Sequence, residues 1–333
     1  MTTLARLTFA TALALSISVG TATAQDAERK DASTQQTTQF APGVVTVIPP
    51  DPNPEETFDG PLTLKTFLDA HPELQWKAPD FTDGSPNFDP RSRTLVEMAK
   101  QVVLRREIYC FEFSFKPLRH IYIDVPVGSS GVQRKLVWYM VYRVRYRGGD
   151  LRPASDEVGG AKLYQRLESV SYDSRRFFPL ATLKDHVSGT QYLDRILPSA
   201  RDRIALREQI TAPLYNSVEI SRLAIPQSSD ESAPGVWGVL TWTDVDPNID
   251  YLSVYVSGLT NAFQQDGEGD DAPYRRKALQ LNFFRPGDAT AQTEDNIRFG
   301  VPAFQDATEQ AYVTSKYGVD ERLDYRWLFR SVK

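Results

Sequence analysis

The chain has 333 residues, with 38 lysines and arginines against 43 aspartates and glutamates, and one cysteine, Cys110. A single cysteine excludes an intrachain disulfide scaffold. An aromatic content of 11% without a glycine period excludes a collagen-like or wholly disordered chain. The net charge of −5 argues against nucleic-acid binding, which requires a basic surface. The length fits one large domain or two smaller ones.

The first 24 residues have the pattern of an export signal. Arg6 supplies a positive charge, residues 7–20 are largely apolar, and residues 22–24 (ATA) form a small-x-small cleavage motif. The apolar stretch would rise only about 21 Å as a helix, less than the roughly 30 Å of a hydrocarbon core. We therefore predict cleavage before Gln25, an exported protein (periplasmic, cell-envelope or extracellular), and a mature chain without a transmembrane segment.

Residues 25–60 are rich in Gln, Thr, Asp and Pro, and this composition predicts a disordered spacer. Only residues 44–48 (VVTVI) interrupt it, and they fit a single strand that docks on the folded body. Residues 62–70 then fit one or two helical turns, which Pro72 and a stretch rich in Asp, Pro and Gly would end.

The β pattern becomes clear from residue 111. Three phenylalanines alternate with Glu112, Ser114 and Lys116, which predicts a half-buried strand. Residues 135–147 form a longer strand with Trp, Met, Tyr and Val on one face. Its other face changes from apolar residues to arginines, so we expect the first half to be covered on both sides and the second half to meet water.

The second half of the chain repeats this kind of pattern after one helix. A surface helix is predicted within residues 196–210, starting after Pro198. Alternating strands are then predicted at 218–225, 235–243, 251–258, 278–285 and 323–330. The fold class is therefore mainly β, an antiparallel β-sandwich of immunoglobulin-like type with one or two short helices. The modules would be 61–190 and 191–333, or a single larger domain with the helix as an insertion.

Motifs for catalysis or cofactor binding are missing from the sequence. The three histidines lack a partner at metal-ligand spacing, and Cys110 has no activating neighbour. Neither a nucleophile elbow nor a phosphate loop or dinucleotide fingerprint occurs. We therefore nominate no catalytic residue and no cofactor other than calcium, and we lean towards a protein without enzymatic activity.

One acidic segment has the spacing of a cation-binding loop. Asp244, Asp246, Asn248 and Asp250 place side-chain oxygens at alternate positions, as a calcium loop does. The match is partial, because Ile249 stands where an EF-hand loop needs glycine. The same residues also fit a hairpin turn, since Asp-Pro-Asn has turn chemistry and lies between two predicted strands.

Two further groups suggest binding. Arg143, Arg145 and Arg147 form a cationic row suited to an anionic polymer or a lipid headgroup, or else a solvated strand face. Tyr251 and Tyr255 point away from the apolar face of their strand. They would either stack on sugar rings or lie buried between two sheets.

Three segments carry a resemblance to a known group of proteins. Residues 111–119 (FEFSFKPLR), 137–144 (VWYMVYRV) and 256–262 (VSGLTNA), together with the export signal, are similar to uncharacterised exported proteins of planctomycete-type bacteria. The resemblance covers most of residues 95–330 and implies export alone, with no activity or functional residue.

The expected function is a structural or partner-binding role in the cell envelope, for an exported, non-enzymatic β-sandwich protein. A calcium- or carbohydrate-binding module is the first alternative, and a hydrolase of envelope polysaccharide is the second. The expected partner is an envelope protein or a polysaccharide, and not nucleic acid.

Overall fold

The computed structural model describes residues 45–57, 106–127, 131–158, 161–228, 235–265, 273–287 and 296–331. Residues 42–333 form one compact unit. The predicted export signal and the predicted helical turns at 62–70 lie outside the described residues.

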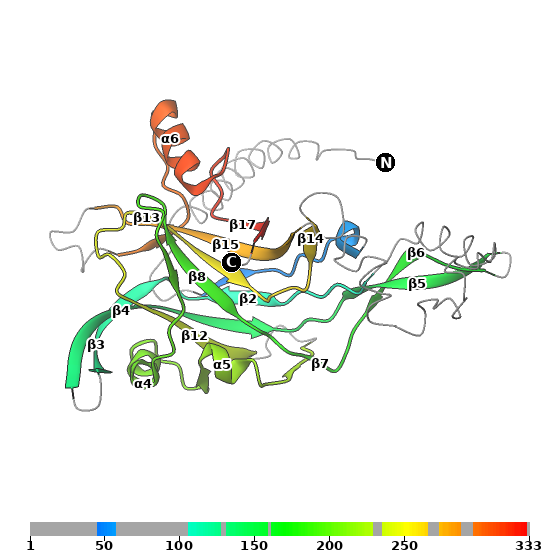
Figure 1. Ribbon diagram of the computed structural model, residues 1–333, viewed down its shortest axis with the longest axis horizontal. Coiled ribbons are helices and arrows are strands. Elements are labelled where there is room, and N and C mark those ends of the chain that lie inside the picture. The colour runs from blue at the N-terminus through cyan, green and yellow to red at the C-terminus, as the bar shows by residue number, and fades with distance from the viewer. Residues whose placement is uncertain are drawn as a thin grey trace, which may run out of the picture. The chain divides into compact units, whose positions relative to one another are not determined.

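Two larger sheets make up the body of this unit (Figure 1). The first sheet has the order β1-β2-β4-β12-β10, with β3 also paired to β4. Its strands are β1 (Thr46–Ile48), β2 (Glu112–Phe115), β3 (Arg119–Val127), β4 (Gly131–Arg145), β10 (Leu214–Tyr215) and β12 (Val236–Thr243).

The second sheet has the order β14-β15-β13-β8-β9, and β16 and β17 pair with β15. Its strands are β8 (Leu180–Asp185), β9 (Gln191–Leu193), β13 (Tyr251–Ser257), β14 (Phe263–Gln265), β15 (Tyr274–Phe284), β16 (Arg298–Phe299) and β17 (Tyr325–Arg330). Two small sheets pair β5 (Asp150–Val158) with β6 (Ala161–Val170), and β7 (Ser174–Arg175) with β11 (Ile225–Pro226).

This architecture confirms the prediction of a mainly β, β-sandwich-like fold. One pairing departs from the antiparallel rule, because β10 runs parallel to β12. Strands from both sides of residue 190 enter each larger sheet, which is the arrangement expected for the alternative of one larger domain.

Aromatic side chains fill the space between the two sheets. Phe115 of β2 packs edge-to-face on Phe283 and Phe299 of the second sheet, with ring centroids 6.0 and 5.0 Å apart. Phe113 stacks on Tyr142 of β4 at 5.4 Å. Such large rings bury much apolar area, so this layer supplies most of the hydrophobic stabilisation.

Helix α4 (Pro198–Arg207) covers the outer face of the first sheet. Its Ala200 and Ile204 pack with Val137, Tyr139 and Val141 of β4. Residues 137–141, in the first half of the strand predicted at 135–147, are therefore covered on both sides, as predicted. Two further helices are α5 (Ser217–Ile220) and α6 (Ala307–Tyr317), and a 3-10 helix, η1, spans Pro54–Thr57. No helix in the described ranges is long and apolar enough to cross a membrane.

Residues 45–57, predicted to lie within the spacer, are folded against the body. β1 pairs antiparallel with β2, so the expectation of a docking strand is confirmed. Glu56 and Thr57 of η1 are buried, and Glu56 lies 2.6 Å from the ammonium group of Lys277 on β15. That buried ion pair keeps this polar stretch in place, which composition alone does not show.

The prediction of a strand at 218–225 is wrong, because helix α5 begins at Ser217. Asn216 accepts hydrogen bonds from the backbone N–H groups of Val218 and Glu219, and the Glu219 carboxylate accepts from the backbone N–H of Asn216. This reciprocal capping box stabilises a helical turn and overrides the β propensity of Val218 and Ile220.

Candidate functional site

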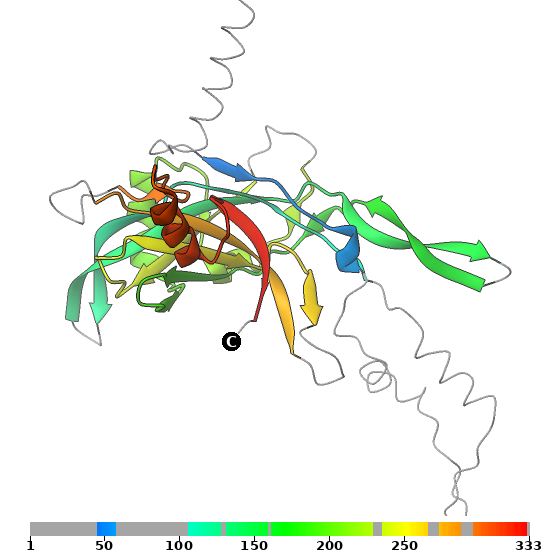
Figure 2. The same ribbon diagram turned by 90° about the horizontal axis from the view of Figure 1, so that it is seen from above.

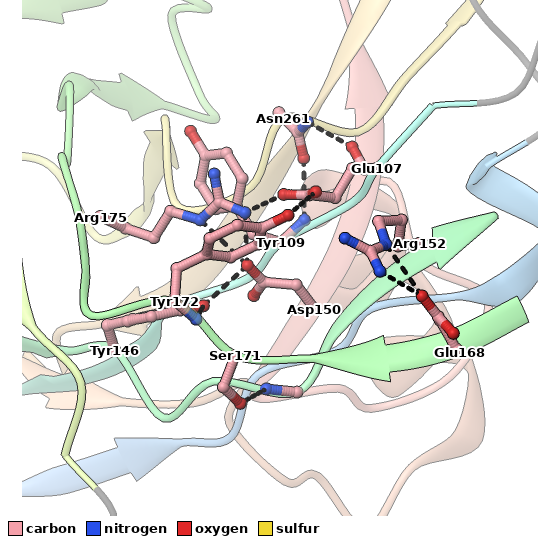
Figure 3. A network of polar contacts seen from close by, with 11 residues as sticks. Glu107, Tyr109, Tyr146, Asp150, Arg152, Glu168, Ser171, Tyr172, Arg175 and Asn261 are labelled. Carbon is pink, nitrogen blue, oxygen red and sulfur yellow. Dashed lines mark hydrogen bonds and ion pairs between the residues drawn. The ribbon is translucent and has the colours of Figure 1, made fainter. Parts of the chain in front are cut away.

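An extensive polar network lies where the β5–β6 hairpin joins the body (Figure 3). Arg175 of β7 donates to Asp150 of β5 at 2.5 and 2.9 Å and to the carboxylate of Glu107. The same guanidinium lies 4.3 Å from the ring centre of Tyr172 and 4.9 Å from that of Tyr109. One cation thus joins two carboxylates and two aromatic rings.

Hydroxyl groups complete the hydrogen bonding of these carboxylates. Tyr146 donates to Asp150 at 2.7 Å, and Tyr172 donates to Glu107 at 2.5 Å. Asn261 binds this segment twice, because its amide donates to the backbone oxygen of Glu107 and accepts from the N–H of Tyr109. The network therefore connects four separate parts of the chain.

The protonation states make this network an anchor and not an acid–base centre. Burial raises the pKa of Tyr109 and Tyr146, and the hydrogen bond to Glu107 raises the pKa of Tyr172. Burial opposes the charge of Arg175, but its bonds to Asp150 and Glu107 outweigh burial and raise its pKa. The tyrosines stay neutral donors and the arginine stays charged, so these four groups do not exchange protons near neutral pH.

The segment that leads into β5 requires a glycine at position 148. Gly148 has φ +75°, and a Cβ there would collide with the hydroxyl of Ser171. The next residue, Gly149, donates its N–H to that hydroxyl at 3.1 Å. Only a glycine fits this approach without strain. A side chain at position 148 would therefore displace Ser171 at the base of the hairpin.

The sequence-predicted calcium loop is a turn held by side chains of this protein. Asp244 has φ +59° and pairs with Lys135 at 2.8 Å. Asp246 accepts from the N–H of Asn248 at 2.8 Å, as in an Asx turn. The guanidinium of Arg285 donates to the backbone oxygens of Pro247 and Ile249. Asp250 is exposed, and its backbone oxygen accepts from the N–H of Arg285 at 2.9 Å.

Metal binding by this loop stays a prediction. Across the described ranges, no group of three or more His, Cys, Asp or Glu side chains is placed to hold an ion.

The arginine row of β4 does not form an open cationic surface. Arg145 is only 6% exposed and lies 2.5 Å from Glu112 on the neighbouring strand β2. Arg147 approaches the same carboxylate at 3.8 Å. Arg143 lies over the ring of Trp237 at 5.6 Å. The expectation that this half of the strand meets water is therefore wrong for Arg145, and Glu112 is buried and not solvent-facing.

A histidine and a serine lie in contact on the outer face of the second sheet. His186 Nε2 is 2.7 Å from the hydroxyl of Ser253, which donates to Asn282 at 2.7 Å. Burial first, and then the charge of Lys184, lowers the pKa of His186 to about 4, so the ring is neutral. Ser253 is fully buried and its proton is directed to Asn282, so substrate cannot reach it as a nucleophile.

The remaining candidates are also inside the fold. Burial raises the pKa of Cys110 to about 12, so its thiol stays protonated and unreactive. Tyr255 is 8% exposed, and the guanidinium of Arg330 lies 4.2 Å from its ring centre. This ring face is therefore not open to a sugar. His120 packs on Trp138 at 5.6 Å, and His71 lies outside the described residues.

The chain matches no known family model, no curated protein and no solved structure. The resemblance to planctomycete-type exported proteins stays a prediction. The anchor around Arg175 was missed in the sequence, because Glu107, Asp150 and Arg175 are far apart along the chain and share no motif.

Proposed function

We propose that this protein is an exported, non-enzymatic protein of the cell envelope, and that it binds a protein partner through the β5–β6 hairpin. The observation that carries the proposal is the Arg175 network, which fixes the base of a hairpin whose β6 edge has no further strand partner among the described residues. Figures 1 and 2 both show this hairpin extending away from the two larger sheets.

A two-stranded hairpin by itself is only marginally stable in water. The network that anchors the β5–β6 hairpin to the body therefore calls for an explanation. β5 and β6 pair with each other over most of their length, and pairs such as Arg152–Glu168 and Arg166–Asp156 connect them. A charged arm on a rigid base presents a surface at little entropic cost, which supports a role in binding.

The two edges of the hairpin differ. The β5 edge is occupied at its base, where Leu151 exchanges two hydrogen bonds with Ile108, and it is interrupted by Pro153 and by an irregularity between Ala154 and Asp156. β6 has no proline, and β5 is its one strand partner in the described part of the chain. Proline and bulges block strand addition, so a partner strand would add to β6.

The test is crosslinking in an extract of the native envelope. A photo-crosslinking residue at position 162 of β6 should capture one protein saturably, and the same residue at position 203 of α4 should not. Replacing residues 153–167 by a short turn should abolish retention of that protein in a pull-down with the immobilised chain, and leave the unfolding transition of the body in place. Retention of glycan without a crosslinked protein would overturn the proposal.

Single prolines locate the contact more finely. Successive backbone N–H groups of a strand point to opposite edges, so Lys162→Pro and Leu163→Pro differ in which edge loses its donor. We expect the variant that loses the outward donor to lose the partner while the hairpin stays formed, as judged by amide exchange. Equal retention of the partner by both variants in a pull-down, without the crosslinking residue, would contradict strand addition at β6.

A further inference from the structure

The outer face of the second sheet carries four cations. These are Lys184 of β8, Arg276 of β15, and Arg326 and Arg330 of β17, which we call the cationic face. The strand register places all four on the side opposite Leu252, Val254 and Leu281, which face the first sheet. The cationic face is therefore the side of the sheet turned away from the aromatic core.

Neutral acceptors hold two of these cations, Arg326 and Arg330, in position. Arg326 Nε donates to the amide oxygen of Gln280 at 2.8 Å, and Arg330 donates to Gln191 at 3.0 Å. The ring of Tyr255 supports the guanidinium of Arg330 at 4.2 Å. These contacts fix the direction of the two guanidinium groups, and no carboxylate of the described residues balances their charge.

Carboxylates are scarce on this sheet. Its described strands contain one, Asp185, whose oxygens accept from the N–H groups of Val187 and Ser188 in the following turn. Asp324, directly before β17, accepts from the N–H of Val301. Neither forms an ion pair with the four cations within the described residues. A face with one sign of charge, in a protein of net charge −5, attracts an anionic ligand.

Exposed leucines border the cationic face. Leu180 and Leu193, 43% and 63% exposed, lie along β8 and β9, whereas Thr182, Tyr255 and Ser257 on the same side of the sheet are buried. Helix α6 bounds one end, because the Tyr317 ring packs 5.0 Å from His186 and its backbone oxygen accepts from Gln280. A face bounded by a helix suits a chain lying across it better than a planar bilayer.

From this arrangement we infer that the cationic face binds an acidic polysaccharide. Arg326 and Arg330 are four residues apart on one strand, or about 13 Å, so repeated charges on an extended polymer reach them better than a single small anion does. The two exposed leucines can contact the C–H faces of sugar rings. This inference does not depend on the partner proposed for the hairpin.

The test uses the full mature chain and polygalacturonate as the probe, with neutral dextran as the control polymer. We expect saturable binding to polygalacturonate that weakens with salt, and none to dextran. Arg326→Gln combined with Arg330→Gln should weaken binding about tenfold or more and reduce the slope of log affinity against log salt by roughly two. Arg203→Gln combined with Arg201→Gln on α4 removes the same charge and should leave the affinity unchanged.

Other outcomes would overturn the inference. Equal weakening by the α4 variant would show a general charge effect with no specific face. Equal or tighter binding to polyglutamate, or binding to vesicles containing anionic lipid but not to polygalacturonate, would assign the face to an acidic protein or to a membrane. The variant lacking residues 153–167 should still bind polygalacturonate, so failure of the hairpin proposal and failure of this one give different results.

Discussion

Two rows of arginine lie on the outer faces of the two larger sheets, and their surroundings differ. Arg145 of β4 is buried against Glu112 on the adjacent strand, whereas Arg326 of β17 binds only the neutral amide of Gln280 in the described structure. Both rows alternate with apolar residues along their strands. The difference lies in the neighbouring strand, so the charge of a sheet face depends on its pairing partner more than on its own pattern.

The same contrast separates the hairpin anchor from the cationic face. At the anchor, Arg175 is matched by two carboxylates, Glu107 and Asp150, and this matching contributes to stability. On the cationic face no carboxylate of the described residues matches the charge, so we expect the charge to contribute little to stability and to remain available for a ligand. Substitutions at the two kinds of position should therefore differ in what they change.

The largest effect is expected at the anchor. Arg175→Met leaves the fully buried side chain of Asp150 without its countercharge, which should lower the free energy of unfolding by about 3–5 kcal/mol. Urea unfolding measures this, and adding Asp150→Asn should recover part of the loss. Arg166→Met removes an exposed pair with Asp156 on the hairpin and should cost less than about 1 kcal/mol. Equal costs at both positions would refute an anchor.

A smaller effect is expected for the matched row of β4. Glu112→Gln keeps the shape of the side chain but removes the charge that Arg145, 6% exposed, requires, and should cost about 2–3 kcal/mol in urea unfolding. On the other sheet, Arg326→Gln should cost less than about 1 kcal/mol, because no carboxylate is left unpaired. A larger loss at Arg326 than at Glu112 would reverse the comparison.

The dependence of a side chain's environment on neighbouring strands also limits how much of this structure the sequence predicts. Alternation and turn residues predict β4, β13 and β15 and the mainly β class, because those signals lie within one strand. The burial of Glu112, the Lys277–Glu56 pair and the Arg175 anchor depend on residues brought together from far apart along the chain. The α5 error is of another kind, since the capping box of Asn216 and Glu219 is visible in the sequence and outweighs the β-branched residues that follow.

The charges of the cationic face should also affect how the free energy of unfolding depends on pH. The folded pKa of His186 is about 4, against an ordinary 6.5, because of burial and then the charge of Lys184, with Arg326 also contributing. Unfolded chains therefore bind this proton at higher pH than folded ones do. The contribution of neutral His186 to the free energy of unfolding is fully present above pH 6.5. It is lost as the pH falls towards 4, and the loss is about 2 kcal/mol with allowance for the partial exposure of the ring.

The variant His186→Gln isolates that contribution. Its free energy of unfolding should vary less between pH 6.5 and about 4 than that of the unmodified protein. Arg326→Gln should raise the pKa of His186, as measured by NMR titration, because one repelling charge is removed. An unchanged pKa in that variant would mean that the cationic face exerts no field on the histidine.

The smallest effect is expected at Asp244, a matched charge in an exposed position. Asp244→Gly loses the pair with Lys135, worth about 0–1 kcal/mol, and removes the cost of holding φ +59° in a residue with a side chain, about 1 kcal/mol. The net result should be a gain of a few tenths of a kcal/mol, whereas Asp244→Ala loses the pair and keeps the strain.

Millimolar calcium should leave the Tm of the unmodified protein unchanged relative to EDTA, because Arg285 and Lys135 already supply positive charge to this loop. A rise in Tm with calcium that Asp244→Gly abolishes would show that the turn opens to bind the ion.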